Sequence, residues 1–136
     1  MDDKRTHVGK ARIERDLAPK TEVEKRKSPR FLLNLPIEYS HLRSPNSSSC
    51  HSINASEGGL LICLQQRLEM GECINLKIFF QSGPNLLAIE SIAQVMWVDE
   101  SKENGGEYHH GVKFVTMTEQ DRQQFKGFLD GLFMLA

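Results

Sequence analysis

Apolar residues alternate with polar residues along the segment that begins at Phe31, and this alternation constrains the fold more than any other feature. Successive side chains of a strand point to opposite faces, so the pattern is typical of a strand with one buried face. Pro36 lies between the alternating positions and has no N–H to donate, which predicts an edge strand or a bulge there. Two further segments repeat the pattern. The inward positions predicted in the three segments are Phe31, Leu33, Leu35, Ile37 and Tyr39; Ile74, Leu76, Ile78 and Phe80; and Leu87, Ile89, Ser91, Ala93, Val95 and Trp97.

Short polar segments separate the predicted strands and are expected to form turns or loops. They occupy residues 44–52, 54–59, 82–85 and 101–107. The end of the first segment is also compatible with the start of a further strand. Two more strands are predicted at 60–64 and 108–115. In the second of these, one of His109 and His110 is expected to face inwards. Consecutive strands joined by such short links run antiparallel.

The last part of the chain has the period of a helix. Thr118 is a suitable N-cap, and Asp121, three residues later, completes a near capping box. One helical face carries Phe125, Phe128, Leu129 and Leu132. The chain is therefore predicted to be all-β, with about six antiparallel strands in a closed or partly closed barrel and a C-terminal α-helix, because closure removes exposed strand edges.

The positive charge of the chain is concentrated in front of the predicted fold. The 136 residues suffice for one domain with one core, which we place at 25–136, behind a flexible polar tail at 1–24. Residues 1–30 carry ten Lys/Arg and six Asp/Glu, and residues 31–136 carry seven and twelve, so the balances of +4 and −5 sum to the net charge of −1. An acidic folded part favours a local anion site over a surface that coats nucleic acid.

Features that would place the chain in or across a membrane are not apparent. No run of eighteen apolar residues predicts a membrane helix, and residues 1–30 hold no apolar core of a secretory signal. The three cysteines, Cys50, Cys63 and Cys73, form no C-x-x-C pair, so reduced thiols in the cytoplasm are predicted. The cysteines and histidines lack the spacing of structural zinc ligands, and no metal is expected.

Two arginines stand immediately before the first predicted strand, in RKSPR at residues 26–30. Arginine is always charged, and its planar fork of donors matches a phosphate or the edge of a guanine. Pro29 has a fixed φ and biases Ser28 toward an extended conformation, so Arg26 and Arg30 are expected along a bent segment able to wrap a ligand. A solvated basic tail is the alternative interpretation.

A second polar group follows in NASEGG at residues 54–59. Asn54 offers a donor and an acceptor, and Ser56 adds a hydroxyl on the same side of an extended chain. Gly59, with Gly58, permits a positive φ and the close approach of a ligand to the backbone. A simple polar turn between two strands is the alternative.

In combination, RxxxR (Arg26, Arg30) and NxSxxG (Asn54, Ser56, Gly59), with twenty-three residues between them, resemble the PilZ family of bacterial cyclic di-GMP receptor domains. The family pattern is RxxxR followed by [D/N]xSxxG, which this chain matches without a substitution. The segments AQVMWVDE at 93–100 and HHGVKFV at 109–115 look like the family's later strand with an apolar–Trp pair and its closing GxxF strand. The resemblance covers residues 25–135.

The resemblance implies a six-stranded antiparallel barrel with a C-terminal helix and no catalytic activity. Cyclic di-GMP would be its ligand, and an unidentified effector protein would carry the signal to motility or biofilm control. Arg26 and Arg30 would contact phosphate and guanine, Asn54 and Ser56 would bind the other side of the ligand, and Gly59 would leave room for a base. Gly58 is an accessory candidate. Lys25 is a second accessory candidate. In the family, a further arginine at this position favours the binding of an intercalated ligand pair. Because this chain has Lys25 there, both one and two bound ligands are left open.

Other functions fit the residues less well. A nucleotide-independent adaptor in pilus or motility machinery is the alternative, although family members of that kind tend to lack the arginine pair. A nucleic-acid-binding barrel is disfavoured because the folded part is acidic and offers one Trp and two Tyr for stacking. An enzyme is disfavoured because no thiol has the context of an activated nucleophile. The apolar residues 133–135 are a candidate contact surface. They would bind a partner protein if the chain is a monomer, or a second copy of the chain in a weak homodimer.

Overall fold

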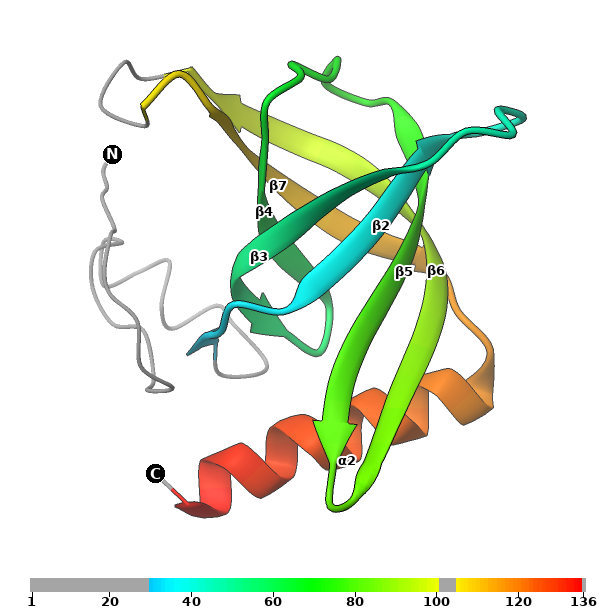
Figure 1. The fold of residues 1–136 in the computed structure, drawn as a ribbon, viewed down its shortest axis with the longest axis vertical. Coiled ribbons are helices and arrows are strands. Elements are labelled where there is room, and N and C mark those ends of the chain that lie inside the picture. Colours follow the sequence, from blue (N-terminus) through cyan, green and yellow to red (C-terminus); the bar gives the residue numbers. More distant parts are fainter. Residues whose placement is uncertain (1–29, 101–104, 136) are drawn as a thin grey trace.

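The computed structural model describes residues 30–100 and 105–135. The predicted tail at 1–24, together with Lys25 and Arg26, lies outside the described residues. The elements, in chain order, are β1 (Phe31–Leu32), β2 (Pro36–His41), β3 (Ser48–Ser56), β4 (Gly59–Leu64), β5 (Cys73–Ser82), β6 (Asn85–Asp99), β7 (Tyr108–Thr116) and α2 (Glu119–Leu135). Figure 1 shows the strands wrapped around a common axis, with α2 crossing one end.

The strands form one antiparallel sheet that closes on itself. Its order is β1-β3-β2-β5-β6-β7-β4, and a further pairing of β3 with β4 joins the two ends. The closed ring therefore contains the six strands from β2 to β7, and β1 is an additional short strand on β3. The predicted six-stranded antiparallel barrel with a C-terminal helix is confirmed.

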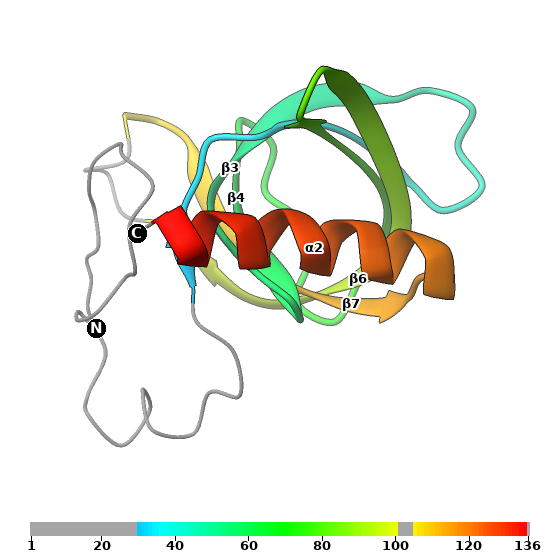
Figure 2. The same ribbon diagram turned by 90° about the horizontal axis from the view of Figure 1, so that it is seen from below.

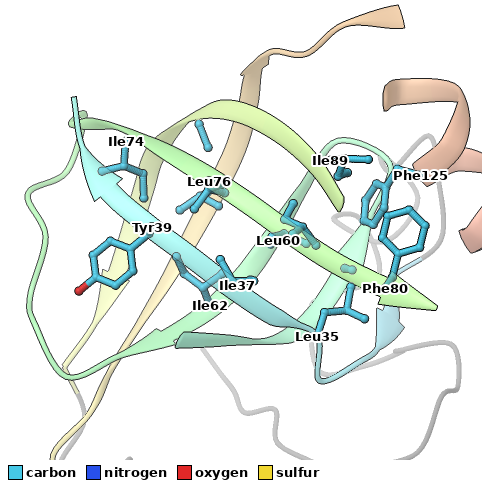
Figure 3. Close-up of a cluster of buried hydrophobic side chains, with 14 of the residues drawn as sticks. Leu35, Ile37, Tyr39, Leu60, Ile62, Ile74, Leu76, Phe80, Ile89 and Phe125 are labelled. Atoms are coloured by element: carbon cyan, nitrogen blue, oxygen red, sulfur yellow. The ribbon is translucent and has the colours of Figure 1, made fainter. Parts of the chain in front are cut away.

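The interior of the barrel is filled by the alternating apolar residues (Figure 3). On β5, Ile74, Leu76, Ile78 and Phe80 are each no more than 2% exposed, as the period of two predicts. Burial of one such side chain contributes about 1.5–3 kcal/mol relative to leaving it in water. A one-residue slip of β5 would turn all four side chains to the outer face, so this row fixes the register of the strand.

Helix α2 covers one end of the barrel, which Figure 2 shows from below. Phe125 is 1% exposed, and Phe80 packs against Phe125 and Phe128 with ring centroids 5.8 and 4.6 Å apart. The hydroxyl of Thr118 accepts the backbone N–H of Asp121 at 3.1 Å, which confirms the N-cap. The carboxylate of Asp121 accepts the backbone N–H of Glu90 at 3.0 Å and so ties the first turn of α2 to β6.

Two strand boundaries differ from the prediction. The alternating segment from Phe31 to Tyr39 is not one strand, because residues 33–35 leave the ladder between β1 and β2. The break ends at Pro36, which supplies no N–H to a ladder. NASEGG is not a turn as a whole, since residues 54–56 complete β3 and β4 starts at Gly59. Only Glu57 and Gly58 lie between the two strands, so the hairpin is much tighter than predicted.

Trp97 was predicted in line with the inward residues of β6, and this is wrong. The pairing of β6 with β7 shifts between Val95 and Trp97. Such a bulge reverses the alternation of side chains beyond it. Val95 is 1% exposed, whereas Trp97 is 38% exposed.

Candidate functional site

The residues of the two sequence motifs meet where β1 pairs with the end of β3. In that ladder Phe31 lies opposite Ala55, and Leu32 lies opposite Asn54. This pairing brings Arg30, which directly precedes β1, beside the NxSxxG segment. The guanidinium Nη1 of Arg30 donates a hydrogen bond to Oδ1 of Asn54 at 3.1 Å. The described parts of the two motifs are thus in direct contact.

The outward orientation of Asn54 and Ser56 depends on a bulge in β3. Ser52 pairs with Ile62 and is fully buried on the core side, and the pairing with β4 then shifts before Asn54. Ala55 is 0% exposed and belongs to the core. Because side chains alternate along a strand, the neighbours of Ala55 lie on the outer face of the barrel. If β3 alternated regularly through Ile53 instead of bulging there, Asn54 and Ser56 would point into the core.

Neither motif glycine has the positive φ that the prediction allowed for. The close approach of a ligand to their backbone stays a prediction. Gly59 is buried, and a Cβ there would overlap the carbonyl oxygen of Val112 on β7. Gly58 is exposed, with nothing within 4 Å of a Cβ, and its carbonyl accepts the N–H of Phe114 at 2.9 Å. Gly59 therefore serves the close approach of β4 to β7.

Ser56 closes the hairpin that carries the motif. It pairs with Gly59 across the two-residue turn, and its hydroxyl reaches the Gly59 carbonyl at 3.5 Å. That distance is long for a hydrogen bond from a hydroxyl, so the Ser56 hydroxyl can reorient toward a ligand at little cost. Lys113 lies opposite Gly59 on β7 and is exposed, which adds a cation beside the hairpin.

One row of paired residues leads from the motif across the outer face to Trp97. Asn54 pairs with Leu61, Leu61 with Gly111, and Gly111 with Trp97. The indole of Trp97 lies over Gly111, where a Cβ would overlap its ring. Sequence reasoning placed Trp97 in the core; the glycine in its facing strand was the signal that an aromatic ring covers that backbone.

An ion pair connects the motif hairpin to α2. The ammonium of Lys126 lies 3.9 Å from the carboxylate of Glu57 and 2.9 Å from that of Asp130. The hydrogen bond that Lys126 donates to Asp130, more than the charge of Glu57, raises the pKa of Lys126. All three side chains are substantially exposed, so solvent and salt weaken these attractions.

The family assignment follows from the whole chain. A model of the PilZ domain family matches residues 24–131. This chain belongs to the PilZ domain family. Of the two motifs, Arg30, which precedes β1, and Asn54 and Ser56 on β3 lie together on the outer face.

Solved structures with the same fold include three PilZ-type proteins. The inhibitor of motility MotI/DgrA of Bacillus subtilis has a TM-score of 0.68 and 17% identity, over 87% of this chain and 62% of that one. MrkH, a c-di-GMP-dependent transcription regulatory factor, has a TM-score of 0.61 and 16% identity, over 82% and 52%. The PilZ domain of Escherichia coli YcgR, solved with c-di-GMP, has a TM-score of 0.57 and 12% identity, over 81% and 92%.

These similarities describe a fold and its extent. The chain spans 62% of the MotI/DgrA structure and 52% of MrkH, but 92% of the YcgR domain. At 12–17% identity, the likeness shows the barrel and not a shared ligand. Comparison with curated protein sequences found no match.

Two thiols of the PilZ barrel are held in the protonated form. Burial raises the pKa of Cys50 to about 12. Burial, together with the Glu107 carboxylate that accepts the Cys63 S–H at 2.9 Å, raises the pKa of Cys63 to about 12. Thiolate chemistry at neutral pH is therefore disfavoured at both positions. Within residues 30–100 and 105–135, no three His, Cys, Asp or Glu side chains are grouped to hold a metal ion.

Two hollows of the barrel lie away from the motif residues. One, of about 690 Å³, is lined by residues of β2, β5, β6 and β7 and by Thr118. The other, of about 530 Å³, is lined by Tyr39, Cys50, Cys63 and neighbouring polar groups. Neither includes Arg30 or Asn54 in its lining. No helix in the described part of the chain is long and apolar enough to span a membrane.

Proposed function

We propose that this PilZ domain is a receptor for cyclic di-GMP, which binds on the outer face of the barrel beside β1 and β3. The contact between Arg30 and Asn54 carries the proposal, because it joins one residue of RxxxR to one residue of NxSxxG. Membership of the PilZ family and the fold shared with the c-di-GMP-bound YcgR domain support it.

The chemistry of the site suits a doubly charged ligand with two guanine rings. Arg30 is partly buried, and its fork of donors matches a phosphate or the Hoogsteen edge of guanine. Asn54 accepts a hydrogen bond from Arg30, and Ser56 lies beside it on β3, so an amide and a hydroxyl adjoin the proposed site. Lys113 adds charge, and the indole of Trp97 offers an aromatic face at the far end of the row.

Arg26 belongs to the same proposal, although it lies outside the described residues. It precedes Arg30 by four residues, and we propose that the two arginines together contact phosphate and guanine, with Asn54 and Ser56 on the other side of the ligand. Lys25 and Gly58 remain accessory candidates. The bound domain is proposed to signal in the cytoplasm through an effector protein and without catalysis of its own.

Calorimetric titration of the full chain with cyclic di-GMP tests the function. We expect a dissociation constant in the micromolar range or below, equivalent to a binding free energy of about −8 kcal/mol or better. GTP and cyclic di-AMP serve as controls for charge and for base identity, and both should bind much more weakly. Equal and salt-sensitive binding of all three would contradict a specific receptor. No binding of any of them would favour a nucleotide-independent adaptor.

A further inference from the structure

The hydroxyl of Ser52 bridges the break between β1 and β2. It accepts the backbone N–H of Leu35 at 2.9 Å and donates to the carbonyl oxygen of Leu33 at 2.6 Å. The backbone of the same region adds two bonds, from Ser52 N–H to the Leu35 carbonyl at 3.0 Å and from Leu33 N–H to the Ile53 carbonyl at 3.1 Å. One side chain therefore supplies two of the four bonds that hold residues 33–35 to β3.

These bonds have no ready substitute. Leu35 is 7% exposed and Ser52 is 0% exposed, so water does not readily replace a lost partner. Residues 33–35 lie outside the ladder and end at Pro36, which has no N–H to offer. A buried backbone N–H or carbonyl without a partner is unfavourable, and a short hydroxyl that both donates and accepts satisfies one of each.

Ser52 lies between the two halves of the candidate site in the covalent chain and in space. Asn54 follows it by two residues, across the bulge that turns Asn54 outward. Leu33, which accepts its hydrogen bond, follows Arg30 by three residues, with only β1 between them. The hydroxyl thus fixes the segment that carries Arg30 against the strand that carries Asn54.

We propose that Ser52 is a positioning residue of the ligand site: its hydroxyl sets the place of β1 on β3 and thereby holds the Arg30 guanidinium at Asn54. Ser52 itself faces the core and does not touch the ligand. The inference rests on the proposed function, because its main consequence is ligand affinity. It adds a residue outside both motifs to the determinants of binding.

The first test is Ser52→Ala in the full chain, measured by calorimetry with cyclic di-GMP. We expect affinity to fall about tenfold, which corresponds to 1.4 kcal/mol. Ile89→Val is the matched control, because it removes a buried methylene from β6, a strand that pairs with neither β1 nor β3. The control should lose stability and keep its affinity. Wild-type affinity in Ser52→Ala would overturn the inference.

A double-mutant cycle separates positioning from a general loss of structure. If Ser52 acts through Arg30, adding Ser52→Ala to Arg30→Ala should weaken binding little further. Losses that simply add would show that Ser52 does not act through Arg30. Ser52→Thr, which keeps the hydroxyl, should restore most of the affinity. If the alanine variant does not fold, the near-isosteric Ser52→Cys, a weaker donor, allows the same comparison.

Amide hydrogen exchange gives a readout that needs no ligand. In Ser52→Ala, the amides of Leu33 and Leu35 should exchange faster, while those of β5 and β6 change little. If wild type fails to bind cyclic di-GMP, the proposed function fails, and this exchange pattern still decides whether Ser52 fixes β1. Unchanged protection at Leu33 and Leu35 would overturn the inference on its own.

Discussion

The indole of Trp97 lies directly over the backbone of Gly111, so that the exposed ring and the glycine fit each other across β6 and β7. Gly111 is buried beneath this ring, and the same row of pairings continues through Leu61 to Asn54. An aromatic side chain held in this way has little freedom to move. It forms a fixed edge of the outer face on which the motif residues lie.

Gly111→Ala should displace the indole, because the added Cβ would occupy the space of the ring. Such overpacking costs about 1–3 kcal/mol of stability. Trp97 is the one tryptophan of the chain, so its fluorescence spectrum reports the displacement directly. Gly58→Ala is the matched control, because a Cβ there meets nothing within 4 Å. An unchanged spectrum and an unchanged melting temperature in Gly111→Ala would contradict the packing described.

Arg30→Ala should weaken cyclic di-GMP binding about ten- to a hundredfold, since one charge-assisted hydrogen bond contributes about 1.5–3 kcal/mol. Arg30→Lys should recover only part of the loss, because an ammonium lacks the planar fork. Arg122→Ala removes the same charge from an exposed position on α2 and should leave affinity unchanged. Equal losses in the Arg30 and Arg122 variants, measured by calorimetry, would indicate a generic electrostatic effect.

Gly59→Ala should lower the melting temperature markedly, whereas Gly58→Ala should change it little. A Cβ on Gly59 would overlap a backbone carbonyl of β7, and a strand cannot yield there without loss of ladder bonds. The two substitutions add the same methyl group one residue apart. Thermal unfolding of the pair, without ligand, therefore isolates the packing role of Gly59. Comparable melting temperatures for the two variants would show that β4 and β7 tolerate the added atom.

Stability should fall in mild acid because of His110. Burial lowers the pKa of His110 below its usual value, although the nearby Tyr108 carbonyl acts in the opposite direction. Its Nε2 accepts the backbone N–H of Leu68 at 3.0 Å, which requires that nitrogen to be unprotonated. A lowered folded-state pKa means that this stability is fully present above the unfolded pKa of about 6.5 and is lost as the pH falls below it.

Urea unfolding at a series of pH values from neutral to mildly acidic measures this dependence. Among the groups around the imidazole, Arg67 and His109 also lower the pKa of His110, and Glu72 raises it. His110→Gln keeps an acceptor in place of the imidazole and should flatten the part of the profile just below neutrality. A variant profile as steep as that of wild type would assign the acid sensitivity to other groups.

Much of the barrel could be predicted from local sequence. The inward residues of β5 alternate without interruption, and all four are buried as predicted. The same holds for Thr118 as the cap of α2 and for Phe125 on its buried face. In these segments the period of the strand or helix is not interrupted by a bulge, so it alone decides which side chains are buried.

Apart from the interruption signalled by Pro36, the sequence did not predict the places where the period is broken. Bulges at Ile53 and beyond Val95 reverse which face a side chain takes, and they depend on partner strands far away in the chain. The bulge in β3 turns Asn54 outward, and the bulge in β6 moves Trp97 out of the core. Gly59 lacks the positive φ that the prediction allowed for, and the need for glycine there comes from a carbonyl on β7, which the local sequence does not reveal.

The amino-acid sequence by itself determined the class of fold, the six-stranded core and the identity of the motif residues, because apolar periodicity and residue chemistry are local properties. Only the tertiary structure decided that Arg30 lies against Asn54, that Ser52 joins their two segments and that Trp97 faces outward. Each of these depends on how strands distant in the chain align, and that alignment results from packing and hydrogen bonding of the whole barrel.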